Sequence, residues 1–218
     1  MKLRDALHIS AKRQRQASRV MQALLGLMVV VGLVSRNGGV VVNALVAFAV
    51  TFLPGVLEHD YDIPMDAGLT LWLTLAVFLH GLGTVALPFV GTPYADVWWW
   101  DHLTHALSAS IVAAVGYATA RAFDLHSEAV SLPSRFMFVF ILTFTIAFGV
   151  FWEVIEFLIS LAAAAFGVGT VLTQYGLGDT MMDLLFNTLG AVVVAVWGGG
   201  QLSGVVTALT TRFDRSRV

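Results

Sequence analysis

Long apolar stretches alternate with short polar breaks along this chain. A helix needs about 20 apolar residues to cross the roughly 30 Å of hydrocarbon in a bilayer. Six stretches meet or approach that length, the first two being short and the fifth long: residues 20–34, 40–57, 67–90, 102–123, 136–166 and 181–197. None of the breaks is long enough for a soluble domain. The pattern therefore predicts an all-α fold, a polytopic transmembrane helical bundle of about six spans.

Composition agrees with this pattern. Of the 218 residues, 58% are hydrophobic and only 12% are charged, and the mean hydropathy is +0.82. Most of such a chain is expected to be surrounded by lipid, so we expect a multi-pass protein of the cell (inner) membrane. Its expected partners are membrane lipids and not nucleic acid. The chain contains no cysteine, so any bound metal must be held by oxygen and imidazole ligands.

The distribution of basic residues predicts the orientation, because cytoplasmic loops carry an excess of lysine and arginine. With six spans, only Arg36 lies on the outer side. The cations on the other side are Lys2, Arg4, Lys12, Arg13, Arg15, Arg19, Arg121, Arg135, Arg212, Arg215 and Arg217. Both termini are therefore predicted to be cytoplasmic.

This topology divides the chain into four parts. Residues 1–19 form a basic cytoplasmic amino-terminal segment, residues 20–90 hold helices one to three, residues 91–197 hold the motif-bearing helices four to six, and residues 198–218 form a basic cytoplasmic tail. The first apolar stretch has no small-residue cleavage site, so we interpret it as a retained span. Three glycines at 198–200 are expected to end or kink the sixth helix.

Acidic residues and histidines cluster inside, or directly before, the last three apolar stretches. They are Asp101, His102 and His105 in helix four, Glu153 and Glu156 in helix five, and Asp179 and Asp183 in helix six. No lysine or arginine occurs from residue 37 to 120 or from 136 to 211. Because an unpaired carboxylate in hydrocarbon costs several kcal/mol, the clusters require protons, histidinium, a metal ion or a water-filled cavity.

Helical spacing predicts that the clusters meet. Positions i and i+4, or i and i+3, share a helix face. Glu153 lies 17 residues beyond residue 136, which is about 26 Å along a helix rising from the cytoplasm. Helices four and six descend from the outer face, so all three clusters are expected in the outer half of the bilayer.

We predict the following roles. The catalytic candidates are Glu153, Glu156, Asp183 and His105. The candidate ligands of a divalent metal ion (Mg²⁺, Mn²⁺ or Zn²⁺) are Asp101, His102, His105, Glu153, Glu156, Asp179 and Asp183. Further polar groups, for substrate contact or for structure, are Asn187, Ser108 and His80.

Structural interpretations stay open beside these roles. Asp101 and Asp179 stand at helix starts, where a carboxylate caps free backbone N–H groups. The more interior polar residues can act as hydrogen-bonding links between helices, and His80 can bond a neighbouring carbonyl.

The three motifs also resemble known families. The segments at 100–105, 151–157 and 178–191 resemble the motifs of VanZ-like proteins and of the YjdF-like predicted inner-membrane proteins, over roughly residues 94 to 197. The VanZ-like pattern is a histidine, a glutamate followed by glutamine, and a D-x-x-x-N-x-x-G-A helix. The matching positions are His105, Glu153 or Glu156, Asp183, Asn187, Gly190 and Ala191.

This chain departs from the VanZ-like pattern at two places. It lacks the Glu-x-x-Gln, having Glu156 where an amide is expected, and it has no arginine just before Gly178. Together with Thr173 and Gln174, these departures favour the YjdF-like side. The best-known association of VanZ-like proteins is glycopeptide-antibiotic resistance, and the resemblance implies a shared fold and site rather than a named reaction.

Three classes of function fit these observations. In the first, the cluster binds a divalent ion and the protein is a hydrolase or transferase acting on a lipid-linked substrate. In the second, the same groups carry a proton or cation in a coupled transporter, although no inverted repeat is visible. In the third, the protein is a non-catalytic lipid-binding accessory protein whose polar core specifies helix packing.

Overall fold

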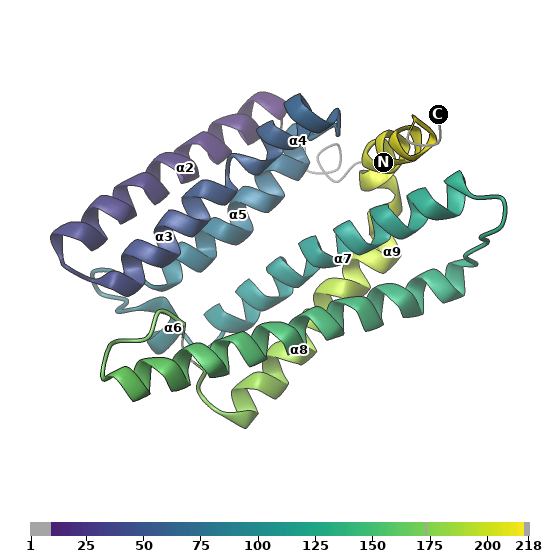
Figure 1. The fold of residues 1–218 in the computed structure, drawn as a ribbon. Coiled ribbons are helices and arrows are strands. Elements are labelled where there is room, and N and C mark those ends of the chain that lie inside the picture. Colours follow the sequence, from purple (N-terminus) through teal and green to yellow (C-terminus); the bar gives the residue numbers. More distant parts are fainter. Residues whose placement is uncertain (1–9, 173, 216–218) are drawn as a thin grey trace.

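A computed structural model describes residues 10–172 and 174–215 (Figure 1). Its helices are α2 (Ala11–Val34), α3 (Gly38–Val50), α4 (Leu53–Tyr61), α5 (Ala67–Gly83), α6 (Pro93–Asp96), α7 (Trp100–His126), α8 (Ser134–Phe166) and α9 (Leu177–Arg215). Lys2, Arg4 and Arg217, used in the charge argument, and Thr173, used in the resemblance, lie outside the described residues.

The all-α, multi-pass prediction is confirmed. Five helical segments are long and apolar enough to cross a membrane: Ala11–Val34, Gly38–Tyr61, Trp100–His126, Ser134–Phe166 and Leu177–Arg215. Helix α5 is a shorter apolar helix of 17 residues, which is the third of the predicted spans. The orientation of these segments in the membrane stays a prediction.

Several helix boundaries differ from the predicted spans because hydropathy marks apolar residues rather than helix ends. Helix α2 begins at Ala11 instead of residue 20, since the Ser10 side chain accepts a hydrogen bond from the Arg13 backbone N–H at 3.3 Å. Helix α5 ends at Gly83 instead of residue 90. Beyond it the chain turns back, and the Leu87 backbone N–H donates to the Gly91 carbonyl at 2.8 Å.

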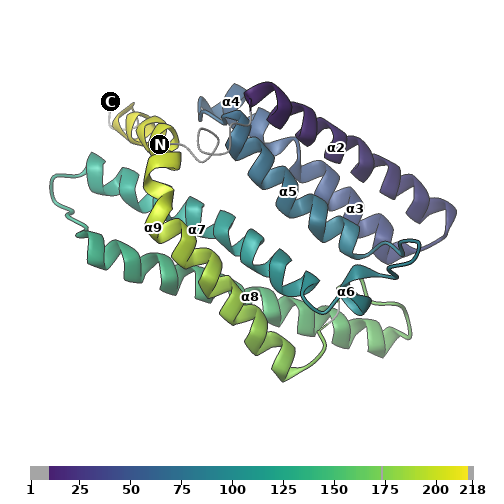
Figure 2. The same cartoon turned by 180° about the vertical axis from the view of Figure 1, so that it is seen from behind.

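The second span consists of two helices, and the sixth is longer than expected. The break between α3 and α4 falls at Thr51, whose hydroxyl donates to the Phe48 carbonyl at 2.6 Å. Pro54, which has no backbone N–H to donate, then lies in the first turn of α4. Helix α9 continues through the glycines at 198–200 to Arg215. Its last part, yellow in Figure 2, turns away from the direction of the rest.

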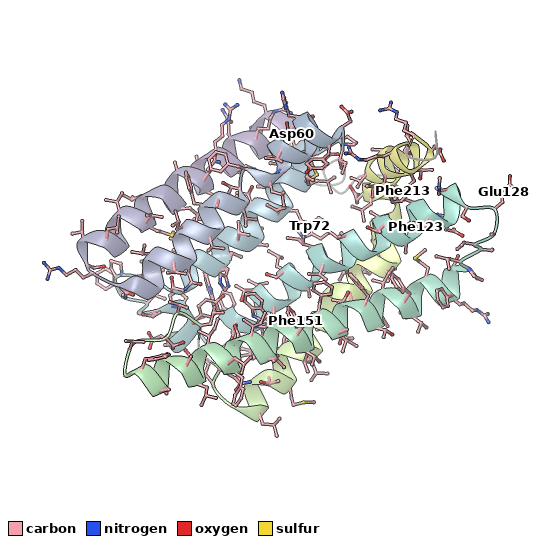
Figure 3. All side chains as sticks on the ribbon, viewed as in Figure 1. Asp60, Trp72, Phe123, Glu128, Phe151 and Phe213 are labelled. Carbon is pink, nitrogen blue, oxygen red and sulfur yellow. The ribbon has the colours of Figure 1, made fainter. Side chains whose placement is uncertain are left out.

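Two groups of three helices build the molecule: α2, α3 and α5 form one, and α7, α8 and α9 form the other (Figures 1 and 2). Leu25 and Ala44 are buried in the core of the first group. Ala113, Ile141 and Ala191 are buried in the core of the second. The groups meet through α5 and α7, where the Trp72 indole N–H donates to Ser110 Oγ at 3.0 Å (Figure 3).

Helices α7 and α9 pack with their backbones in contact. A Cβ built on Gly190 of α9 would overlap the carbonyl oxygen of Ala106 and would lie 3.1 Å from the backbone nitrogen of Ser110. Neither of these backbone atoms can rotate away as a side chain can. A small residue at position 190 is therefore required for this helix pair, as is common in membrane bundles.

We expect Gly190→Ala to destabilise the protein, because the added methyl forces α7 and α9 apart. The expected loss is about 1–3 kcal/mol of unfolding free energy, as for other overpacked cores. Thermal unfolding in detergent measures it. Gly200→Ala in the same helix is the matched control, since a Cβ there meets nothing within 4 Å and alanine is the better helix former. Equal stability of the two variants would contradict the packing argument.

Cysteine labelling tests the predicted orientation, because the natural chain contains no cysteine. Ala129→Cys marks the α7–α8 connection and Gly169→Cys marks the α8–α9 connection, both exposed positions. If the termini are cytoplasmic, a membrane-impermeant maleimide added outside intact cells labels residue 169 and not residue 129. The reverse pattern would show the opposite orientation.

Candidate metal centre

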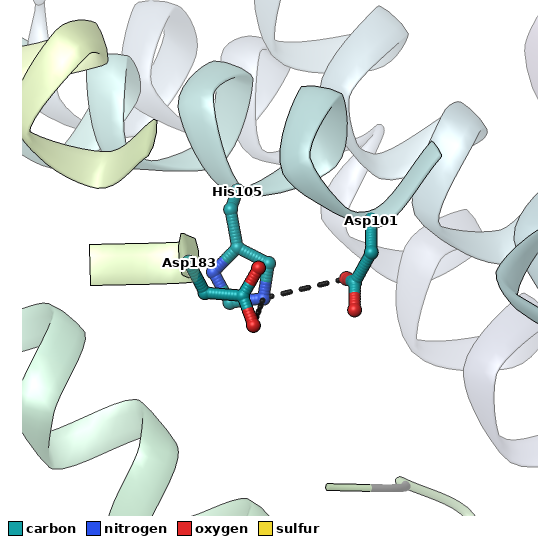
Figure 4. Close-up of side chains that lie close together, drawn as sticks. All are labelled: Asp101, His105 and Asp183. Carbon is teal, nitrogen blue, oxygen red and sulfur yellow. Dashed lines mark ion pairs between the residues drawn. The ribbon is translucent and has the colours of Figure 1, made fainter. Parts of the chain in front are cut away.

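Three predicted site residues from two helices converge around one imidazole nitrogen (Figure 4). Asp101 and His105 lie one turn apart on α7, and His105 Nε2 is 3.5 Å from Asp101 Oδ1. Asp183 on α9 places its Oδ2 3.9 Å from the same nitrogen. The side chains of Asp101, His105 and Asp183 are 18%, 10% and 1% exposed, so the group is nearly closed to solvent.

These separations suit a shared ion better than direct hydrogen bonds. Hydrogen bonds from nitrogen to oxygen have heavy-atom distances of about 2.7–3.2 Å. Ligand atoms placed about 2.0–2.2 Å from a tetrahedral ion lie roughly 3.4 Å from one another. The three ligand atoms of this group all lie within 4.8 Å of one another, so small side-chain movements bring them to that spacing.

Asp183 lies close to two histidines of α7, His102 and His105. Its other oxygen, Oδ1, lies 3.2 Å from His102 Nδ1. The His102 ring stacks on Phe186 with 4.8 Å between ring centroids, which fixes its orientation. His102 therefore lies beside the group around His105 and holds Asp183 in place, rather than supplying a ligand atom to that group.

The glutamates of α8 form a second group with the same histidine. Ligand atoms of His105, Glu153 and Glu156 also lie within 4.8 Å of one another. The Thr180 hydroxyl donates to Glu153 Oε2 at 2.9 Å, and the Trp152 indole N–H donates to Glu156 Oε1 at 2.9 Å. Among the described residues Glu153 Oε1 is buried without a hydrogen-bond partner, so this oxygen is an unused acceptor.

Asp179 does not join either group of ligand atoms. Its Oδ2 accepts a hydrogen bond from the Tyr175 backbone N–H at 3.1 Å, so it fixes the loop at the start of α9. The Asp101 carboxylate, in contrast, is directed at His105, and in the described part of the chain it accepts no hydrogen bond from a backbone N–H. The capping interpretation of Asp101 therefore finds no support.

The remaining polar candidates lie around the groups. Asn187 is 4% exposed. Its side chain packs against Gly149, where any larger residue would place a Cβ 2.6 Å from Asn187 Nδ2. Ser108 is exposed within the described residues and lines the cavity described below.

His80 is fully engaged by protein groups and has no free nitrogen for a metal. Asn43 Nδ2 donates to the carbonyls of Gly39 and Val171, at 2.9 and 2.7 Å, so Asn43 Oδ1 must be the acceptor for His80 Nε2–H at 3.1 Å. His80 Nδ1 then accepts from the Tyr94 hydroxyl at 2.7 Å. This network joins α3, α5, the segment before α7 and the α8–α9 loop.

Sequence reasoning missed Asn43 and Tyr94. Asn43 is a lone amide in an otherwise apolar stretch, which was the available signal for a buried polar contact. Tyr94 lies in the short helix α6, just before the motif at 100–105, and gives no pattern. Burial raises the pKa of the Tyr94 phenol above its ordinary value, so the hydroxyl keeps the proton that it donates.

A cavity of about 590 Å³ opens beside the groups, between α3 and α5 on one side and α7 and α8 on the other. On α5 and α7 the polar lining residues lie at the end near the clusters and the apolar lining residues lie farther along, and on α3 the lining beyond Asn43 is apolar. On α8, Glu156 lies near the clusters, and Thr145 is a polar lining residue at the far end. The polar end includes Asn43, His80, Asp101, His105 and Glu156. The apolar walls include Val46, Val50, Val77, Val112 and Phe148. The cavity is therefore amphipathic along its length.

Comparison with known proteins identifies the family of the chain. No solved structure matches it. An uncharacterized protein of Thermotoga maritima is 27% identical over 184 residues, which cover 84% of this chain and 89% of the relative. The model of a family described as "Predicted membrane protein (DUF2238)" matches residues 17–204, a range that holds both groups of ligand atoms and Asn43. The chain belongs to this family of membrane proteins.

Proposed function

We propose that the protein is a metal-dependent hydrolase or transferase that acts on a lipid-linked substrate. The observation that carries this proposal is the convergence of His105, Asp101 and Asp183 at ligand-like separations, at the polar end of an amphipathic cavity. A buried imidazole with carboxylates and no basic side chain nearby is a typical environment for a divalent cation.

The donor set indicates which ions fit. One imidazole nitrogen and carboxylate oxygens suit Zn²⁺ or Mn²⁺, whereas Mg²⁺ favours oxygen ligands and keeps several waters. When bound, the ion supplies a Lewis acid for a phosphoryl or carbonyl oxygen and lowers the pKa of coordinated water. His102 contacts Oδ1 of Asp183 and so orients the other oxygen of this carboxylate, Oδ2, toward the ion site.

Glu156 is the residue best placed to move a proton. It lines the cavity, whereas Glu153 and Asp183 do not, and the Trp152 indole N–H fixes one of its oxygens. A positioned carboxyl group between an ion site and a substrate cavity can accept a proton from water and return it to a leaving group. We assign Glu156 this general acid–base role.

The form of the cavity supports a substrate with a polar head and an apolar tail. The polar lining residues surround the ion site, and valines from three helices extend the cavity into the apolar part of the bundle. On α3, the lining from Gly39 to Val50 extends about 16 Å along the helix axis. The resemblance to VanZ-like and YjdF-like proteins is consistent with this proposal but names no reaction.

A proton- or cation-coupled transporter is the second candidate, and Glu153 favours it. The orphan Oε1 of this buried carboxyl group is accounted for if the group exchanges a proton during transport. The metal content of the protein separates the two candidates.

The first test is elemental analysis of detergent-purified protein after dialysis against a weak chelator. We expect close to one Zn²⁺ or Mn²⁺ per chain in the wild type, and at least a tenfold loss of affinity in Asp183→Asn, which removes a ligand charge. Asp179→Asn is the matched control, because Asp179 lies outside both groups. An absence of metal from wild type, or equal loss in both variants, would reject the enzyme proposal and favour the transporter.

The second test separates the acid–base role from ion binding. Glu156→Gln is expected to retain the metal and to lose activity by roughly 100-fold or more, the usual contribution of a general acid–base group. Activity is measured by mass spectrometry, as metal-dependent conversion of a lipid species in proteoliposomes made from total membrane lipids. Glu128→Gln, an exposed glutamate in the α7–α8 connection, is the control. Full activity of Glu156→Gln would remove Glu156 from the mechanism.

A further inference from the structure

A second cavity, of about 410 Å³, lies between α2, α4 and the start of α5, at the opposite end of the first helix group from His105. Its lining combines apolar residues with charged and hydroxyl-bearing side chains, among them Asp66, whose Oδ1 accepts hydrogen bonds from the backbone N–H groups of Gly68 and Leu69. Arg15 and Arg19 line it from α2, Glu58 lines it from α4, and Thr70 and Thr74 line it from α5. The charge distribution predicts that this end of the bundle faces the cytoplasmic leaflet.

The two arginines form a pair of donors directed at one space. They lie four residues apart, so their side chains leave the same face of α2. In the described part of the chain neither guanidinium makes an ion pair with a carboxylate. Planar guanidinium groups bind phosphate oxygens by paired hydrogen bonds, and two of them at a membrane surface suit a phosphate.

The inner walls of the cavity offer acceptors instead. The hydroxyls of Ser18, Thr70 and Thr74 donate to the carbonyls of Gln14, Met65 and Thr70, at 3.2, 3.4 and 2.7 Å. Each hydroxyl hydrogen is thereby used, and the oxygen lone pairs are left for a donor. Glu58 adds a carboxylate, so a cationic donor is favoured within the cavity.

We propose that this cavity binds the phosphoethanolamine headgroup of a membrane phospholipid. Arg15 and Arg19 hold the phosphate, and Glu58 with the threonine hydroxyls accepts hydrogen bonds from the ammonium group. The arrangement pairs the phosphate with guanidinium groups from α2 and the ammonium group with a carboxylate from α4 and hydroxyls from α5. This site is separate from the metal centre, and it remains whether or not the metal proposal holds.

The test uses the full-length protein in detergent micelles with added phosphatidylethanolamine or phosphatidylglycerol. Native mass spectrometry measures the retained lipid, and thermal unfolding measures the stabilisation. We expect the wild type to retain phosphatidylethanolamine in preference to phosphatidylglycerol. Arg15→Gln/Arg19→Gln is expected to bind it roughly tenfold more weakly or worse, since charge-assisted hydrogen bonds to the phosphate are lost.

The matched control is Lys12→Gln/Arg13→Gln, which removes the same charge from exposed positions of the same helix outside the cavity. This control should bind as the wild type does. Arg15→Lys/Arg19→Lys, which preserves charge and helix propensity, should fold normally and still bind more weakly, because lysine lacks the bidentate fork. Equal losses in the two glutamine variants would overturn the proposal in favour of general surface charge.

Two further measurements address the headgroup itself. Glu58→Gln should keep lipid binding but lose the preference for ethanolamine over glycerol, and equal retention of the two lipids by the wild type would overturn the ethanolamine assignment. Inorganic phosphate should give no comparable stabilisation. If it does, the site belongs to a free anion rather than to a lipid.

Discussion

The rest of this structure depends on one constraint, which is that carboxyl groups are buried without a lysine or arginine beside them. Asp183 is 1% exposed, and no lysine or arginine occurs from residue 37 to 120 or from 136 to 211. The imidazoles of His102 and His105 are its neighbours, and both come from α7. Helix α9 must therefore approach α7 closely, and Gly190 permits this by bringing backbone against backbone. The contacts of Asp183 with the two histidines therefore depend on a glycine at position 190.

The same constraint links the two groups of helices. Asn43 and His80 belong to the first group, yet their hydrogen bonds reach Tyr94 and the Val171 carbonyl of the α8–α9 loop. A buried amide or imidazole left unpaired would cost about 1–3 kcal/mol, so these contacts hold the first group in a fixed position beside the site. Residues 37–84 contribute one wall of the cavity of about 590 Å³ and part of its polar end, so this part of the chain is more than an attached scaffold.

Contacts between residues close together in the sequence could be predicted, whereas the individual contacts between distant segments could not. Asp101 and His105 were recognisable as a pair because a helix places positions i and i+4 on one face, and Asp183 was recognisable by its position in a span. Tyr94 was not recognisable, because its contact with His80 depends on how the connection between α5 and α7, which contains α6, folds against α5. Hydropathy located the apolar part of α2 but not its polar first turns, which the Ser10 cap and helix-forming side chains add.

The close packing of α7 against α9 also limits the size of the cation that could fit between these helices. Gly190 touches the carbonyl of Ala106, the residue next to His105, so backbone atoms rather than flexible side chains set the spacing of the two helices there. A large ion such as Ca²⁺ takes six to eight oxygen ligands at about 2.3–2.6 Å and needs a wider, adaptable site. Widening this one requires the two helices to separate. In the proposed metal centre, discrimination between small and large cations would therefore depend on the contact between the two helices as much as on the ligands themselves.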